Sequence, residues 1–119
     1  TQFGANLCTL APGAWSSQRH WHTKNDELIQ VVEGEVVLVT GEGEEVLRAG
    51  DWAGFKAGDA DGHCFQNRSD KPAVILEIGT RFADDETTYS DIDMITIAGK
   101  PGYHHRDGTP YPVQKRRTA

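Results

Sequence analysis

The stretch RHWHTKNDELIQVVEGE, residues 19 to 35, carries two histidines one residue apart, a glutamate five residues later and a glycine near its end. On a β-strand, residues two apart point to the same side, so His20 and His22 project together. The residues TKND form a turn, and Glu27 opens the next strand, from which its carboxylate reaches back toward both imidazoles. Imidazole nitrogens together with a carboxylate oxygen suit a divalent transition metal. The stretch therefore predicts two neighbouring strands that share a metal site.

The rest of the sequence also predicts strands. Apolar runs are short, turn residues separate them, and none has the length and periodicity of a capped helix. This pattern is typical of a sandwich or small barrel. Strands are expected at 5–10, 15–22, 27–32, 36–40, 45–51, 52–55, 63–67 and 73–79, with a further one at 91–97. Residues 80–90 are acidic and polar and are expected to form a surface connection, and the Gly- and Pro-rich stretch after 97 is expected to be irregular.

Composition excludes several functional classes. A chain of 119 residues suits one domain, and a net charge of −6 disfavours binding to a phosphate backbone. The basic run QKRR, residues 114–117, is interpreted as a solvated tail. No apolar run predicts a membrane span, and two cysteines do not form a disulfide framework, so a cytoplasmic location is expected. The chain begins at Thr1 rather than Met, so the gene product is expected to be longer.

A second block, GDWAGFKAGDADGHCFQN at residues 50–67, supports the metal site. A His-x-His pair alone is more often structural than metal-binding. Together, however, the two blocks resemble the paired motifs of the cupin superfamily. The first motif is carried by Gly13, His20, His22, Glu27 and Gly34, and the second by Gly50, Gly58, His63 and Asn67. Two departures lie in the second motif: Lys56 stands where the family usually has proline, and four residues rather than two separate Gly58 from His63.

The resemblance implies a fold and a ligand set. The fold would be an all-β double-stranded β-helix, the jelly-roll-like cupin barrel, over residues 1–98. Residues 99–119 would then be an irregular extension that packs on the barrel or on a partner subunit. The metal ligands would be His20, His22, Glu27 and His63, and the ion would be Mn, Fe, Ni, Co or Zn. The chain also resembles small single-domain bacterial cupins, a group without a general assigned activity.

Strand alternation predicts a pocket beside the metal. Glu27 and Ile29 share one face of their strand, and His63 and Phe65 share one face of theirs. Ile29 and Phe65 are therefore expected to line the pocket, whereas Cys64 points away from the metal. Gln18 lies on the same face as the first histidine pair. It is a candidate to hydrogen-bond a ligand, and a backbone-bonded rim residue is an equal alternative.

Three polar residues outside the motifs allow two interpretations each. Glu77 interrupts the apolar run AVILEIG, and an ion pair with Arg81 or Arg68 is favoured over a role as a pocket acid or base. His104 and His105 lie in the irregular extension. They are interpreted as ordinary loop histidines rather than as a lid over the pocket.

Three functions fit this site. The favoured one is a metal-dependent enzyme, of dioxygenase, lyase, isomerase or decarboxylase type, acting on a small polar carboxylate, hydroxyketone or sugar-like metabolite. The alternatives are a non-catalytic binding or sensor module with a structural metal, and a barrel in which the metal only stabilises the fold. The expected partners are a small molecule and a second copy of the chain, because Trp15 and Trp21 are expected on an exposed face that a homodimer would cover.

Overall fold

The computed structural model describes residues 2–112, and within that range the chain forms β-strands and no helix. The strands are β1 (Phe3–Leu10), β2 (His20–His22), β3 (Glu27–Glu33), β4 (Glu35–Thr40), β5 (Gly43–Arg48), β6 (Trp52–Phe55), β7 (Cys64–Gln66), β8 (Ala73–Thr80) and β9 (Thr87–Tyr89). The prediction of an all-β fold is confirmed.

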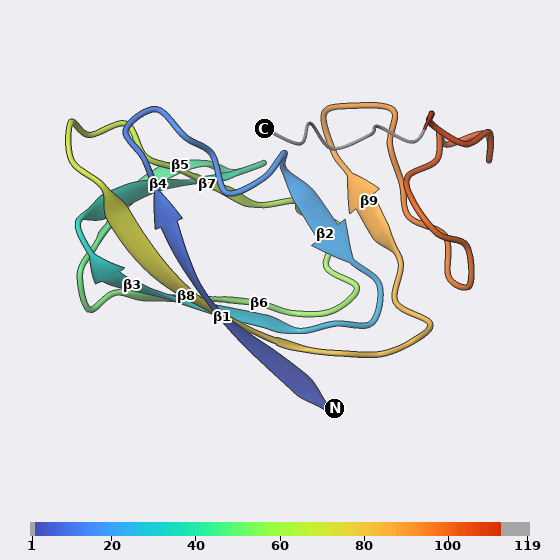
Figure 1. The fold of residues 1–119 in the computed structure, drawn as a ribbon, viewed down its shortest axis with the longest axis horizontal. Helices are drawn as coiled ribbons and strands as arrows, with labels where there is room; N and C mark the ends of the chain where they lie inside the picture. The colour runs from blue at the N-terminus through green and yellow to red at the C-terminus, as the bar shows by residue number, and fades with distance from the viewer. Residues whose placement is uncertain (1, 113–119) are drawn as a thin grey trace, which may run out of the picture.

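The strands pair in three antiparallel sheets. The largest has the order β1-β8-β3-β6, the second has the order β5-β4-β7, and β2 pairs with β9 alone. Figure 1 shows the two larger sheets as the two walls of the molecule, with β2 and β9 side by side at one end. In the described part of the chain, the three sheets do not merge into one closed barrel, although two backbone hydrogen bonds between His20 and His63 link β2 to the residue before β7.

The core lies between the two larger sheets. On β3, Ile29 and Val31 are 3% and 1% exposed, whereas the alternate residues Leu28 and Val32 face outward. Side chains from both walls complete the core: Leu10, Val36, Leu38, Leu47, Phe65, Ala73 and Ile75. Each large apolar side chain buried here contributes roughly 1.5–3 kcal/mol to folding. This packing fixes the inward face of β3, on which Glu27 also lies.

A glycine turn joins the two walls of the core. Gly34 connects β3 to β4 with a φ of 77°, a left-handed conformation that glycine adopts without strain. A Cβ atom at this position would lie 2.9 Å from the carbonyl oxygen of Pro72. The motif glycine is therefore required both by backbone conformation and by space.

Two predicted strands differ from the structure. Within the predicted strand 15–22 only His20–His22 is a strand, because the preceding residues bend along β7, where Ser16 donates its N–H to the carbonyl of Phe65. Residues 91–97 are not a strand, and the strand in this region is instead β9, inside the segment predicted to be a connection. Thr87 and Thr88 are β-branched and pair with β2, which the local composition did not reveal.

The segment after β9 packs beside that strand. Ile95 and His104 pair through two backbone hydrogen bonds, and the Arg106 guanidinium donates to the carbonyl of Tyr89 at 2.7 Å. The division of the chain after residue 98 stays a prediction, and the basic run at 114–117 lies outside the described residues. Within 2–112, no helix has the length and apolar character needed to cross a membrane.

Candidate metal centre and adjoining cavity

Two strand pairings bring the sequence-predicted ligands together. His20 and His22 lie on β2 and project to the same side, as predicted. His63, just before β7, exchanges two backbone hydrogen bonds with His20, at 3.1 and 2.9 Å. Glu27 begins β3, directly after the turn that follows β2. Residues up to 43 positions apart thus meet at one point.

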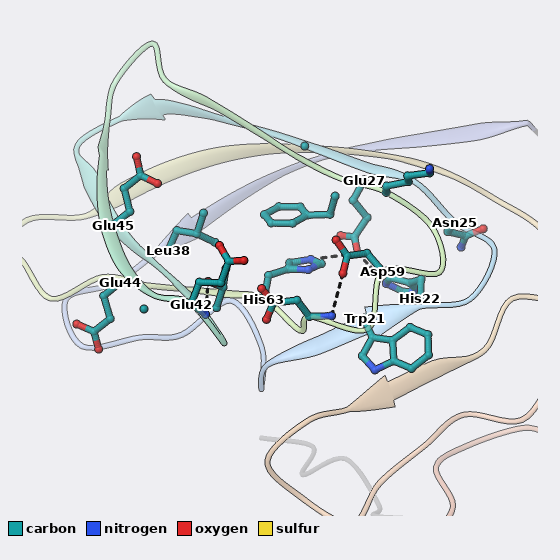
Figure 2. Close-up of a pocket in the computed structure, with 16 residues that line it drawn as sticks. Trp21, His22, Asn25, Glu27, Leu38, Glu42, Glu44, Glu45, Asp59 and His63 are labelled. Atoms are coloured by element: carbon teal, nitrogen blue, oxygen red, sulfur yellow. Dashed lines mark hydrogen bonds and ion pairs between the residues drawn. The ribbon is translucent and has the colours of Figure 1, made fainter.

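One carboxylate oxygen lies among the three imidazoles. Oε1 of Glu27 is 2.8 Å from Nε2 of His22, 3.3 Å from Nε2 of His63 and 3.7 Å from Nε2 of His20. One ligand atom each from His20, His22 and Glu27 lies within 4.8 Å of the others, which is compatible with a single ion. Figure 2 shows His22, Glu27 and His63 converging at one end of a cavity.

In two of the imidazoles, the Nδ1 atom has a partner of its own that orients the ring. Nδ1 of His22 lies 2.8 Å from Oδ2 of Asp85 and 3.2 Å from the hydroxyl of Thr87. Nδ1 of His20 lies 2.9 Å from the carbonyl oxygen of Gln18. These contacts turn each Nε2 toward the centre, as metal-binding histidines require. Sequence reasoning missed Asp85, because nothing in the acidic segment 80–90 distinguishes it from its neighbours.

The third imidazole is positioned by an aromatic ring. The rings of His63 and Phe55 stack with centroids 3.6 Å apart and an interplanar angle of 8°. His63 is 4% exposed, and its Nε2 atom and Oε1 of Glu27 are buried without a hydrogen-bond partner. Buried polar atoms are normally satisfied. A cation between these two atoms would satisfy both, so the residues present fit a metal ion.

The charges in the site are consistent with a cation. Burial alone would raise the pKa of Glu27, but contacts with the three imidazoles outweigh it and hold that pKa well below its ordinary value. For His22, burial acts to lower the pKa, while Glu27 and Asp85 raise it above its ordinary value overall. The site therefore stabilises positive charge beside an ionised carboxylate, as expected of a cation-binding site.

A cavity of about 370 Å³ opens from the centre to the surface. Its inner end is formed by His22, Glu27 and His63, and Phe55 and Leu38 add apolar wall. Carboxylates are numerous along its outer part, where Glu42, Glu44, Glu45, Asp59 and Asp61 line it together with Lys56. This size suits a small molecule.

The predicted pocket residues lie in different places. Ile29 and Phe65 line a second, smaller cavity of about 120 Å³, which also contacts Glu27 and His63. The side chain of Gln18 is exposed, and its contact with the site is made through its backbone carbonyl. Cys64 is buried with its Sγ near the amide of Gln66, and it is not among the clustered ligands of the described chain.

Glu77 lines the smaller cavity and does not form the predicted ion pair. Arg68 pairs instead with Glu44, and the Arg81 guanidinium lies over Gly4. Among the described residues, neither arginine makes an ion pair with Glu77. Burial and the charge of Glu27 together raise the pKa of Glu77. Glu77 is the residue of β8 that pairs with Ile29 of β3, and it places a second carboxyl group near the centre.

The two tryptophans and the two histidines of the C-terminal extension differ from one another in exposure. Trp15 is 52% exposed, but Trp21 is half-buried and lines the large cavity, so it does not lie on an outer face as predicted. His104 is buried, and His105 contacts Asp93 at 2.9 Å. Neither histidine lines the cavities described above, and their interpretation as loop histidines stays a prediction.

Known proteins share this architecture. A protein from Silicibacter pomeroyi, named as a sugar phosphate isomerase from a cupin superfamily, is 45% identical over 95% of this chain and 73% of its own, with a TM-score of 0.88. A cupin protein from Bacteroides fragilis is 26% identical over 68% of this chain and 67% of its own, with a TM-score of 0.61. An oxalate oxidase solved with the substrate analogue glycolate shares the fold alone, at 20% identity and a TM-score of 0.56 over 66% of this chain and 41% of its own.

The family comparison agrees with the motif resemblance. No curated protein matches the sequence. The model of the cupin domain family matches residues 6–79, which include all four predicted ligands and the strands that carry them. The chain therefore belongs to the cupin domain family.

Proposed function

We propose that the chain is a metal-dependent enzyme in which His20, His22, Glu27 and His63 hold one divalent transition ion. The observation that carries this proposal is the position of Glu27 Oε1, which is buried, lacks a hydrogen-bond partner and lies within 3.7 Å of three imidazole Nε2 atoms. A bound cation would satisfy the two buried atoms that have no hydrogen-bond partner, Oε1 of Glu27 and Nε2 of His63.

The donor set narrows the identity of the ion. Three imidazoles and one carboxylate suit Mn, Fe, Ni or Co, and Zn is a less favoured occupant because catalytic Zn sites usually have three protein ligands. When bound, the ion would polarise an oxygen of the substrate as a Lewis acid. His22 would be held in place by Asp85, and His63 by the stacked ring of Phe55.

The substrate class is a small polar metabolite, such as a carboxylate, a hydroxyketone or a sugar-like molecule. The cavity of about 370 Å³ is large enough for it and opens on the side of the proposed ion. The name of the Silicibacter pomeroyi relative supports an isomerase-type reaction. Isomerisation of a hydroxyketone moves one proton between neighbouring carbons and a second proton between their two oxygens. Glu77, with its raised pKa, is a candidate acid or base because the smaller cavity that it lines shares Glu27 and His63 with the large one.

The alternatives make different predictions. A sensor would bind its ligand tightly and release no product. A metal that only stabilises the fold would lower the melting temperature when chelated, and the protein would bind no small molecule. An enzyme would turn over substrate, lose this activity on chelation and regain it with one particular metal.

A homodimer and a cytoplasmic location belong to the same proposal. Exposed large apolar side chains support association, among them Trp15 and, on β1, Phe3 and Leu7. Cys8 and Cys64 are both free thiols, which fits a reducing compartment.

The decisive test is elemental analysis of protein purified without added metal. The wild type should carry close to one equivalent of a transition ion. His22→Ala should lose most of it, whereas His105→Ala, which removes an imidazole outside the site, should keep it. Full occupancy in His22→Ala would refute the assignment of the ligands.

A further inference from the structure

We propose that the large cavity favours neutral or cationic ligands, so that among the substrates proposed above a hydroxyketone or sugar-like molecule fits it better than a carboxylate, and a phosphorylated ligand fits it least. This selection would separate the chain from the Silicibacter pomeroyi relative, whose name includes a sugar phosphate. This inference rests on the proposed metal site and adds the charge class of the molecule that approaches it. It follows from the acidic rim of the cavity, defined as Glu42, Glu44, Glu45, Asp59 and Asp61.

The rim carries an excess of negative charge. Five carboxylates line it, and Lys56 is the single lysine or arginine among the lining residues. Figure 2 shows Glu44 and Glu45 on the far side of Leu38 from His63, and Asp59 beside Glu27 and His22. A ligand moving toward the imidazoles would therefore pass carboxylates along the length of the cavity.

Two of the five carboxylates are largely compensated. Glu44 makes a bidentate pair with Arg68, at 2.7 and 2.8 Å. Asp61 lies 3.4 Å from the Arg19 guanidinium and accepts the N–H of Gly41. Neither arginine lines the cavity.

The other three carboxylates are not compensated. Glu42, Glu45 and Asp59 make no ion pair within the described chain, and only Lys56 faces them with opposite charge. Of these three, Asp59 has a polar contact, accepting the N–H of Asp61 at 3.1 Å. The rim thus presents about three uncompensated negative charges against one positive charge.

The inner end of the cavity lies at the proposed metal site. His63 is 4% exposed, lines the inner end of the cavity, and has an Nε2 atom with no hydrogen-bond partner. Trp21 and Phe55 add aromatic surface. Aromatic faces favour the C–H side of a polyol and attract cations, but they contribute nothing to phosphate recognition.

The expected effect follows from electrostatics in a cleft. A concave site lined by one sign of charge focuses the potential, raising the local concentration of cations and lowering that of anions by roughly tenfold or more. Salt screens this effect, because exposed charges farther apart than the Debye length of about 8–10 Å interact only weakly. Discrimination against anions should therefore weaken as ionic strength rises.

The test uses Co²⁺-loaded protein, whose visible absorption reports a new ligand on the ion. Inorganic phosphate is the anionic probe, and imidazole at pH 8 is the neutral one. The variant Glu42→Gln/Glu45→Gln/Asp59→Asn removes the uncompensated charges. The control Glu33→Gln/Asp70→Asn/Asp84→Asn makes the same change of net charge at exposed positions outside the cavity.

The inference expects imidazole to bind all three proteins equally. Phosphate should bind the rim variant about tenfold more tightly than the wild type or the control, with a smaller difference at high salt. Equal phosphate affinity in the rim variant and the wild type would overturn the inference, as would failure of imidazole to reach the ion. If the triple variant does not fold, Glu45→Gln and Asp59→Asn alone should each strengthen phosphate binding about twofold.

The same experiment separates this inference from the proposed function. The stoichiometry of Co²⁺ tests the metal site, and the ratio of phosphate affinities tests the rim. Wild-type protein that fails to bind Co²⁺ would refute the proposed function. Stoichiometric Co²⁺ with no difference in phosphate affinity would refute only the charge selection.

Discussion

Asp85 holds His22 from the side opposite Glu27. Its Oδ2 atom lies 2.8 Å from Nδ1 of His22, while its Oδ1 accepts the backbone N–H groups of Lys24 and Asn25. The carboxylate therefore fixes both the imidazole and the turn that leads from β2 to Glu27. A residue remote in sequence sets the relative position of two proposed ligands.

Replacing Asp85 should weaken the metal site without dismantling the turn. Asp85→Asn keeps an oxygen that can accept from the two backbone groups but removes the charge beside His22. Loss of such a carboxylate partner typically costs 10- to 100-fold in metal affinity. Competition with a chromogenic chelator measures the change, and Asp84→Asn, at the exposed neighbouring position, is the control. An unchanged affinity in Asp85→Asn would show that the carboxylate does not support the ligand.

The raised pKa of Glu77 predicts how stability depends on pH. A carboxyl group with a higher pKa in the folded state binds more protons folded than unfolded. The free energy of unfolding is therefore highest below the pKa that Glu77 has in the unfolded chain. It falls as pH rises through the higher pKa that Glu77 has in the folded protein. Glu77→Gln in metal-free protein should therefore raise the melting temperature at pH 7 and change it little near pH 4.

Thermal unfolding of the two proteins across this pH range checks the expectation. Glu44→Gln, which changes a surface carboxylate paired with Arg68, serves as the comparison because the pKa of Glu44 is lowered rather than raised. A melting temperature for Glu77→Gln that falls at pH 7 would mean that the charged form of Glu77 makes a favourable contact.

The turn at Gly34 should tolerate no side chain. Gly34→Ala places a Cβ 2.9 Å from the carbonyl oxygen of Pro72 in a left-handed conformation. The conformation alone costs about 1–2 kcal/mol, and the clash adds to it. Gly99→Ala is a matched control, since Gly99 has a φ of 79° but open space around it. Urea denaturation should show a larger loss of stability in Gly34→Ala, and equal losses would mean that Pro72 yields without cost.

The proposed homodimer would cover exposed apolar surface on one edge of the large sheet. β1 is an edge strand, and its residues Phe3 and Leu7 are 65% and 67% exposed. A second copy of the chain would cover them. Sedimentation at micromolar concentration should give a dimer, and Leu7→Glu should give a monomer. A monomeric wild type would refute the proposed dimer.

The clustering of the proposed ligands could be predicted from the sequence better than their surroundings. His20, His22 and Glu27 were found because strand alternation and a four-residue turn are local properties. Asp85 and the acidic rim were missed because their roles depend on contacts between segments far apart in the chain. Asp85, for instance, lies 63 positions from His22.

Two other expectations failed for physical reasons. The ion pair expected for Glu77 assumed that a buried acid must find a nearby arginine, but Arg68 is taken by Glu44 on the neighbouring sheet. Trp21 was expected outside because it alternates with two histidines. β2 has only three residues, and two neighbours on it, Trp21 and His22, both line the large cavity.

The paired backbone hydrogen bonds between His20 and His63 would have a consequence for exchange of the proposed ion. They join the backbones of two donor residues from distant segments without any contribution from an ion. Loss of an ion would then leave these two backbones paired, and rebinding would require little ordering of the chain.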